Sequence, residues 1–231
     1  MRLQERLYKR EIWGIMVLLV LHVFVLPMLI TAGKLWWGWD FFGLSDGGIN
    51  FAYYTIGLVL CFVFAGKYLR RSFDSMLDHP LEGVKAFFLA WVIYWGANMA
   101  VNIVMLCFDF FQATNPNQAA IENVANYSSG VILALSVFMA PIVEEVIFRG
   151  GIFCGLYHKS RVAAYLVSIL AFSLYHVWQF ALVSGNLTLL LYALQYVAAS
   201  FALCWCYEKS GSIWVSIAFH MSMNALAFLM M

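Results

Sequence analysis

Long apolar runs make up most of this chain, and their length limits the possible fold more than any other feature. A helix needs about 20 consecutive apolar residues to cross the hydrocarbon core of a bilayer. Runs of this order lie at residues 12–32, 50–69, 84–110, 129–156, 162–183, 187–207 and 212–231. Only 11% of the residues are charged, against roughly 25% in soluble domains. The sequence therefore predicts an all-α, multi-pass helix bundle of about seven transmembrane helices in a cell membrane.

The distribution of basic residues predicts how this bundle is oriented. Lysine and arginine gather in the first 11 residues and in the loops after the second, fourth and sixth runs, whereas the alternate loops carry Lys34 alone. Because basic loops stay in the cytoplasm, the N-terminus is expected there and the C-terminus outside. A half-span near residues 110–128 would make eight helices and reverse this parity. The net charge of +1, without a basic patch interleaved with aromatic residues, gives no indication of nucleic-acid binding.

The cysteines indicate neither a disulfide framework nor a metal site. There are five, an odd number, at positions 61, 107, 154, 204 and 206. Their spacing matches no zinc-binding pattern, and most lie inside apolar runs. We expect all five to be small buried hydrophobic residues.

One apolar run contains three charged residues, in the stretch APIVEEVIFRGG at residues 140–151. A charge at the centre of a membrane helix costs about 2.5–3.5 kcal/mol even on insertion scales, so such residues need partners or a function. Glu145 and Arg149 are four residues apart and are predicted to form an ion pair on one helix face. Glu144 points about 100° away from Glu145, which leaves it for another partner.

Other polar residues in later runs are expected to reach the depth of Glu144. At about 1.5 Å per residue, Glu144 and His176 each lie roughly 20 Å from the cytoplasmic ends of their spans, and His220 and Asn224 roughly 12 and 18 Å. His220 and Asn224 are four residues apart, as are Phe172 and His176, so each pair shares a helix face. Phe172 is therefore expected to support the His176 imidazole.

These residue types suit the hydrolysis of an amide bond. A carboxylate and an imidazole beside one water molecule can remove its proton and generate hydroxide. A second imidazole and a carboxamide can stabilise the oxyanion that forms when hydroxide attacks a carbonyl group. The chain has no G-x-S-x-G nucleophile motif. The set therefore favours peptide hydrolysis without a covalent intermediate.

Three motifs occur in order on separate runs: EExxxR at 144–149, continuing as FRG at 148–150; FxxxH at 172–176; and HxxxN at 220–224. They resemble the signature of the CAAX protease and bacteriocin-processing family, also called CPBP or Abi, of intramembrane endopeptidases. The resemblance implies that Glu144 and His176 activate water, that His220 and Asn224 form the oxyanion hole, and that Glu145, Arg149 and Phe172 support them. It covers about the last hundred residues.

The motifs divide the chain into a motif-free part of three helices, residues 1–128, and a catalytic core of four helices, residues 129–231. Eukaryotic members of the family cut prenylated CAAX proteins, whereas many bacterial members are linked to peptide signals, bacteriocins or self-immunity. This chain resembles the bacterial kind. The expected partners are the lipid bilayer and a peptide or membrane-protein substrate.

Two other interpretations fit the same residues. In the first, His176, His220 and a glutamate bind catalytic zinc, which such a ligand set can do. However, there is no HExxH motif, and the Asn224 carboxamide is a poor zinc ligand, so no cofactor is predicted. In the second, the protein is a non-catalytic immunity or regulatory membrane protein that keeps these residues for structure. A transporter is disfavoured, because inverted repeats are not apparent.

Overall fold

The computed structural model describes residues 6–38, 46–107, 115–127, 130 and 133–230. The remaining residues, which include part of the basic N-terminus and the ends predicted for the third and fourth spans, lie outside these ranges. Every regular element in the described part is helical, which confirms the all-α fold class. In chain order the elements are α1 (Lys9–Leu19), η1 (Val20–Val25), α2 (Leu26–Trp36), α3 (Asp46–Asp78), α4 (Pro80–Met105), α5 (Pro116–Tyr127), η4 (Ala134–Met139), α7 (Ala140–Glu145), η5 (Val146–Phe153), α8 (Cys154–Tyr157), α9 (Arg161–Tyr175), α10 (Trp178–Ser184), η6 (Leu187–Ala193), α11 (Leu194–Ser210) and α12 (Ile213–Leu229).

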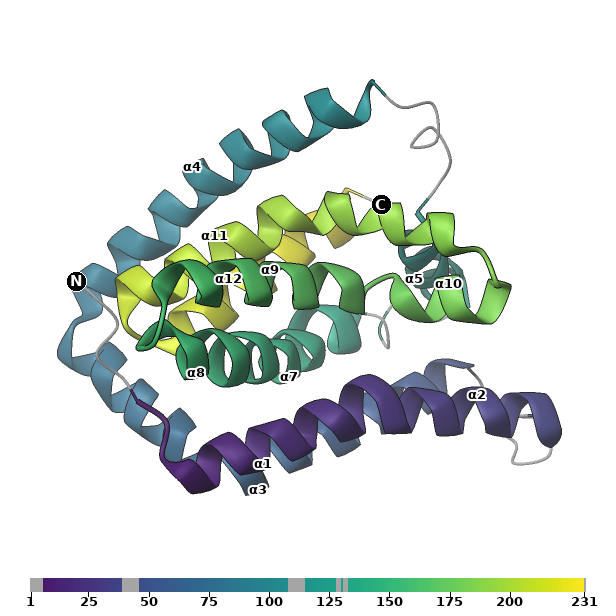
Figure 1. Ribbon diagram of the computed structural model, residues 1–231, viewed down its shortest axis with the longest axis horizontal. Coiled ribbons are helices and arrows are strands. Elements are labelled where there is room, and N and C mark those ends of the chain that lie inside the picture. The colour runs from purple at the N-terminus through teal and green to yellow at the C-terminus, as the bar shows by residue number, and fades with distance from the viewer. Residues whose placement is uncertain (1–5, 39–45, 108–114, 128–129, 131–132, 231) are drawn as a thin grey trace.

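The helices of the C-terminal half form the centre of the bundle (Figure 1). There α11 packs against α9 and α12, and η5 packs against α9. The helix formed by α1, η1 and α2 runs along one side of this group, with α3 packed against α1. On the other side α4 lies at the edge, while α5 and α10 are at the same end of the molecule (Figure 1). The N-terminal helices therefore surround a central group that carries the three motifs.

Each of the seven predicted spans corresponds to a helix or a run of joined helices. Among the described residues, four helices are long and apolar enough to cross a membrane, or five if the bent pair of α9 and α10 is one span. Helix α12 has 17 residues, about 26 Å at 1.5 Å per residue, which is slightly short of a hydrocarbon core of about 30 Å. The polytopic bundle is confirmed, whereas the count of seven and the cytoplasmic N-terminus stay predictions.

Two long helices contain a proline, and each accommodates it in the same way. The π-helical segment η1 ends at Val25, two residues before Pro27, and η4 ends at Met139, two residues before Pro141. Proline lacks an N–H donor, and its ring clashes with the carbonyl of the preceding turn. A wider turn just before the ring relieves that clash. The helix that carries the Glu144–Glu145 pair therefore continues through Pro141, where a straight α-helix would break.

The start of α12 is fixed by a tight turn and by a contact with α3. Gly211 ends α11 with φ of +69°, a left-handed conformation that favours glycine. The Ser212 hydroxyl accepts a hydrogen bond from the Trp214 backbone N–H and donates one to the Ser72 carbonyl at 2.7 Å. In turn, the Ile213 backbone N–H donates to the Ser72 hydroxyl at 2.8 Å. These bonds satisfy helix-terminal groups in the interior and set the height of α12, on which His220 lies.

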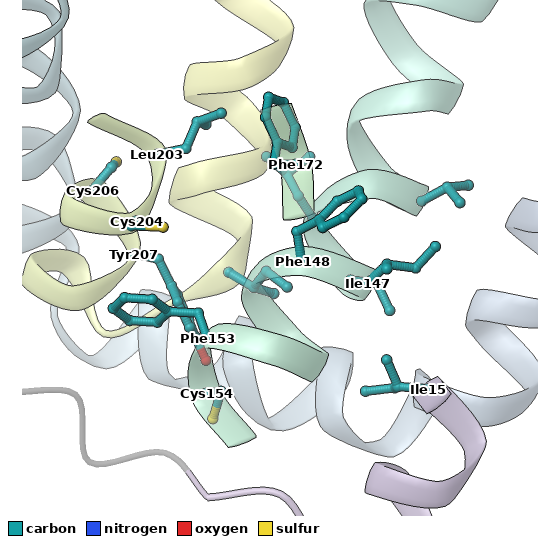
Figure 2. Close-up of a cluster of buried hydrophobic side chains, with 14 of the residues drawn as sticks. Ile15, Ile147, Phe148, Phe153, Cys154, Phe172, Leu203, Cys204, Cys206 and Tyr207 are labelled. Carbon is teal, nitrogen blue, oxygen red and sulfur yellow. The ribbon is translucent and has the colours of Figure 1, made fainter. Parts of the chain in front are cut away.

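The hydrophobic core lies directly beside the charged stretch. Figure 2 shows Ile147, Phe148 and Phe172 next to Leu203 and Cys204 in one buried cluster. Cys61, Cys154, Cys204 and Cys206 are buried, as predicted. Cys107 is exposed, so that prediction is wrong for this residue. It lies just beyond the end of α4 at Met105, where the chain leaves the packed bundle.

Candidate active site

The predicted ion pair between Glu145 and Arg149 is confirmed. Nη1 of Arg149 lies 3.1 Å from Oε1 of Glu145, and both side chains are completely buried. Arg149 also donates from Nη2 to the carbonyl and the hydroxyl of Ser200, at 3.2 and 3.0 Å, and its guanidinium carbon lies 4.2 Å from the centre of the Phe172 ring. The cation thus has a carboxylate, two oxygen acceptors and an aromatic face as neighbours, which is what a charge in hydrocarbon requires.

Glu145 also binds α12, which the sequence did not predict. Its Oε1 lies 3.0 Å from Nδ1 of His220, and its Oε2 accepts a hydrogen bond from the Ser216 hydroxyl at 2.6 Å. Ser216 and His220 are four residues apart on α12, so they share a helix face. That spacing was a signal available in the sequence. One carboxylate therefore neutralises Arg149 and orients His220.

Glu144 faces a different set of neighbours, as the angle between the two glutamates predicted. Its Oε2 lies 3.8 Å from Nε2 of His176 and 3.9 Å from Nε2 of His220. Glu144 is 4% exposed and His220 is equally buried. Both imidazoles therefore turn their Nε2 atoms toward one carboxylate oxygen, at a distance slightly too long for a direct hydrogen bond.

His176 lies at a break between two helices. It ends α9, and α10 continues at an angle of 46° to α9. Its Nδ1 lies 2.8 Å from the Phe172 carbonyl oxygen. Because a carbonyl can only accept, Nδ1 carries the hydrogen, and Nε2 of the neutral ring has a free lone pair. The Phe172 ring lies 4.6 Å from the imidazole, centre to centre, which agrees with the predicted support.

Asn224 is oriented by the helix that carries the glutamates. Its Nδ2 donates to the Ser136 carbonyl in the π-helical segment η4, at 2.7 Å. A carboxamide nitrogen carries two hydrogens. One of them is used in this bond, and the second is available for another acceptor.

The predicted catalytic residues line one cavity of about 780 Å³. Glu144, His176, His220 and Asn224 are all on its wall, together with Phe172. Glu145 and Arg149 are not among the lining residues, and Glu145 contacts His220 from outside the cavity. The structure thus brings the predicted catalytic residues to one cavity and, of the predicted supporting residues, places Phe172 on its wall and the Glu145–Arg149 pair outside it.

Several cavity residues come from helices in which the sequence showed no motif. Helices α2 and α3 contribute Pro27, Asn50, Tyr53 and Tyr54. The N-terminal end of α5 contributes Asn117. Nothing in the spacing of these residues indicates such a role, because their position depends on how distant helices pack.

A metal site was the alternative interpretation of this cluster. Within the described residues, no group of three or more His, Cys, Asp or Glu side chains is arranged to hold a metal ion. The zinc interpretation with His176, His220 and a glutamate can be tested by measuring activity after chelation.

Comparison with known proteins agrees with this arrangement. A family model described as "Type II CAAX prenyl endopeptidase Rce1-like" matches residues 126–226, which include every candidate active-site residue. The chain is also 27% identical over 158 residues to the "Putative membrane peptidase YdiL" of Bacillus subtilis (strain 168). This match covers 68% of the chain and 58% of the relative. The C-terminal part of the chain is thus similar to this endopeptidase family. No solved structure matches it.

The matched segment and the candidate site coincide. Residues 126–226 comprise nearly all of the predicted core, 129–231, although the division into two parts is still a prediction. The cavity wall nevertheless extends to α2 and α3. The matched segment therefore carries all the candidate catalytic residues, and the N-terminal helices α2 and α3 contribute part of the cavity wall.

Proposed function

We propose that this chain is an intramembrane endopeptidase that cleaves a peptide or a segment of a membrane protein with an activated water molecule. The observation that carries the proposal is the position of Glu144 Oε2, 3.8 Å from Nε2 of His176 and 3.9 Å from Nε2 of His220, on the wall of a cavity. Polar atoms at this separation are suitably spaced for a water molecule to bridge them.

Glu144 and His176 activate the water. The carboxylate oxygen and the Nε2 lone pair of His176 both accept protons, and a general base must be within hydrogen-bond reach of the proton it removes, or one water away. As the proton moves to Glu144, the water oxygen attacks the carbonyl carbon of the scissile peptide bond. The two electrons of the carbonyl π bond move to its oxygen, which becomes an oxyanion.

His220 and Asn224 stabilise this oxyanion. His220 contacts Glu145 through Nδ1, so in its imidazolium form it donates from Nε2 toward the cavity, and the Glu145 carboxylate compensates the positive charge. Asn224 offers the second hydrogen of its amide nitrogen, whose first is held by Ser136. Donors fixed in place before the reaction are the most effective means of stabilising developing charge.

The intermediate then collapses. The carbonyl double bond re-forms, the C–N bond breaks, and the proton taken from water passes to the leaving nitrogen. The products are a new carboxyl group and a new amine, with no covalent bond to the enzyme. This defines a glutamate-type hydrolase without a metal or a cofactor.

The comparisons with known proteins support a peptide or membrane-protein substrate. The relative described as a membrane peptidase and the CAAX endopeptidase match both support a peptide bond as the target. We expect a peptide signal, a bacteriocin or a membrane protein to be the physiological substrate.

The test compares membrane-bound and exported peptides in cells that express the wild type, Glu144→Gln, His176→Ala or His220→Ala. We expect a peptide that changes length with the wild type and stays uncut with each variant, while every variant remains inserted at normal abundance. Glu122→Gln, on an exposed carboxylate of α5, is the control and should cleave normally.

Two outcomes would replace the proposal. If all three variants still produce the change that the wild type causes in the cells, the protein acts as a non-catalytic immunity or regulatory protein. If exhaustive chelation abolishes cleavage and zinc restores it, the reaction belongs to a zinc protease with His176, His220 and a glutamate as ligands.

A further inference from the structure

Tyr196, on the first turn of α11, is stacked on the candidate base His176. The two ring centres are 4.2 Å apart, and the ring planes differ by 20°. The Nδ1 bond to Phe172 holds one edge of the imidazole, but a single bond leaves the ring free to tilt about that edge. A parallel aromatic ring in van der Waals contact opposes such a tilt. Stacking and the Nδ1 bond together therefore determine where Nε2 points.

The hydroxyl of Tyr196 is held in turn by the start of α5. It accepts hydrogen bonds from Nδ2 of Asn115 at 3.2 Å and from Nδ2 of Asn117 at 3.1 Å. The Asn115 amide orientation is fixed, because its Oδ1 accepts the Asn117 backbone N–H at 2.9 Å. Asn115 also donates to Gln195, the neighbour of Tyr196. The N-terminal end of α5 is thus attached to α11 at the point where α11 touches the site.

We propose that Tyr196 is a positioning residue: it holds the plane of the His176 imidazole by stacking, and its hydroxyl couples that plane to the N-terminal end of α5. This inference rests on the proposed function in one respect, namely that His176 is the base. A substrate that enters the cavity meets Asn115, Asn117 and Tyr196 together, since all three are on its wall. Any displacement of these asparagines by a substrate would therefore change the orientation of Nε2.

The first readout is spectroscopic and needs no substrate. In detergent-solubilised protein with isotope-labelled histidine, the His176 signals are assigned by their loss in His176→Ala. Stacking on an aromatic ring moves the imidazole carbon-bound proton signals upfield. We expect this upfield shift in the wild type and in Tyr196→Phe, which keeps the ring, and its loss in Tyr196→Leu.

The second readout is kinetic, with an internally quenched peptide as the probe. Misplacement of a reacting group by about 1 Å can cost 10²-fold in rate. We expect Tyr196→Leu to lower kcat about 100-fold with little change in KM, and Tyr196→Phe to restore most of it. Tyr207→Phe is the matched control: it removes a buried tyrosine hydroxyl on the same helix that bonds Tyr68 at 2.9 Å, away from the cavity, and should leave kcat unchanged.

A double-mutant cycle tests the coupling to α5 and does not depend on whether Tyr196→Leu folds. Asn117→Ala should move the His176 signals in the wild-type background and have no further effect in the Tyr196→Phe background, where the acceptor is gone. Equal signal shifts in both backgrounds would overturn the coupling. Wild-type His176 signals and kcat in Tyr196→Leu would overturn the positioning role. Full activity of Glu144→Gln would overturn the proposed function instead, and the spectroscopic result would still decide the stacking.

Discussion

His220 contacts Glu145 through Nδ1, which lies 3.0 Å from Oε1, and this contact connects the structural ion pair to the candidate water site. Glu145 is at the same time 3.1 Å from Nη1 of Arg149. The opposite nitrogen of the imidazole faces Glu144. The two adjacent glutamates thus lie on the two sides of one histidine, and the contact with Glu145 determines that Nε2 faces Glu144.

Ser216 contributes to this orientation, and its removal should affect both stability and catalysis. Its hydroxyl donates to Glu145 at 2.6 Å, and a hydrogen bond to a charged group contributes about 1.5–3 kcal/mol. Ser216→Ala should lower the free energy of unfolding by about this amount and lower kcat, because the Glu145 carboxylate can then rotate. The control is Ser222→Ala, whose hydroxyl bonds the Phe219 carbonyl of its own helix. Equal kcat values for the two variants would contradict the prediction.

Arg149→Met should destabilise the protein strongly, because it removes the guanidinium that pairs with the fully buried Glu145 carboxylate. Removal of one partner of a buried ion pair costs about 3–5 kcal/mol, whereas replacement of both costs much less. In detergent, the unfolding temperature of the single variant should be much lower than that of the wild type. The double variant, Arg149→Met with Glu145→Gln, should recover part of this decrease. For comparison, Lys85→Met breaks an exposed pair with Glu82 and should cost less than about 1 kcal/mol.

Asn224→Asp tests the oxyanion hole. The substitution keeps the size of the side chain but removes both amide hydrogens, including the one that binds Ser136. Loss of one oxyanion-hole donor typically lowers kcat by about 10²–10³. We expect such a decrease in steady-state assays with little change in KM. A variant with normal kcat would show that the carboxamide does not stabilise the oxyanion.

Gly151 allows η5, the helical segment that follows the two glutamates, to pack closely on α1. A Cβ atom at this position would lie 2.6 Å from Cγ2 of Ile15. Gly151→Val should therefore lower the free energy of unfolding by about 1–3 kcal/mol, and Ile15→Ala in the same chain should recover part of the loss. Gly155→Ala is the control on the same run of helix, since nothing lies within 4 Å of its added Cβ. If both glycine variants unfold at the same temperature, the close approach is not the cause.

Glu208 holds three helices together outside the cavity. It accepts hydrogen bonds from Tyr157 at 2.9 Å, from Nε and Nη2 of Arg161 at 2.8 and 3.0 Å, and from Tyr165. Glu208→Gln weakens these charge-assisted bonds and should lower the free energy of unfolding by about 1.5–3 kcal/mol. Since Glu208 does not line the cavity, kcat measured below the unfolding temperature should stay normal, and a large fall in kcat would contradict a purely structural role.

Local features of the site were predictable because they depend on the geometry of a single helix. The pairing of Glu145 with Arg149 and the different direction of Glu144 follow from a repeat of 3.6 residues per turn. The apolar runs required helices, and the cost of charge in hydrocarbon singled out Glu144, His176 and His220. Approximate depth along each span was enough to predict that these residues could meet.

The tertiary structure decided which atoms face each other, because that depends on how helices far apart in the sequence rotate and cross. It placed Ser216 and Ser200 around the ion pair and turned Nε2 of both histidines toward Glu144. It also stacked Tyr196 on His176 and added Tyr53 from a motif-free helix to the cavity wall. Spacing along the chain carries no information about such contacts between distant helices. The sequence therefore determined which residues are candidates for the site and their approximate depth, and the packing of the bundle determined how they are arranged.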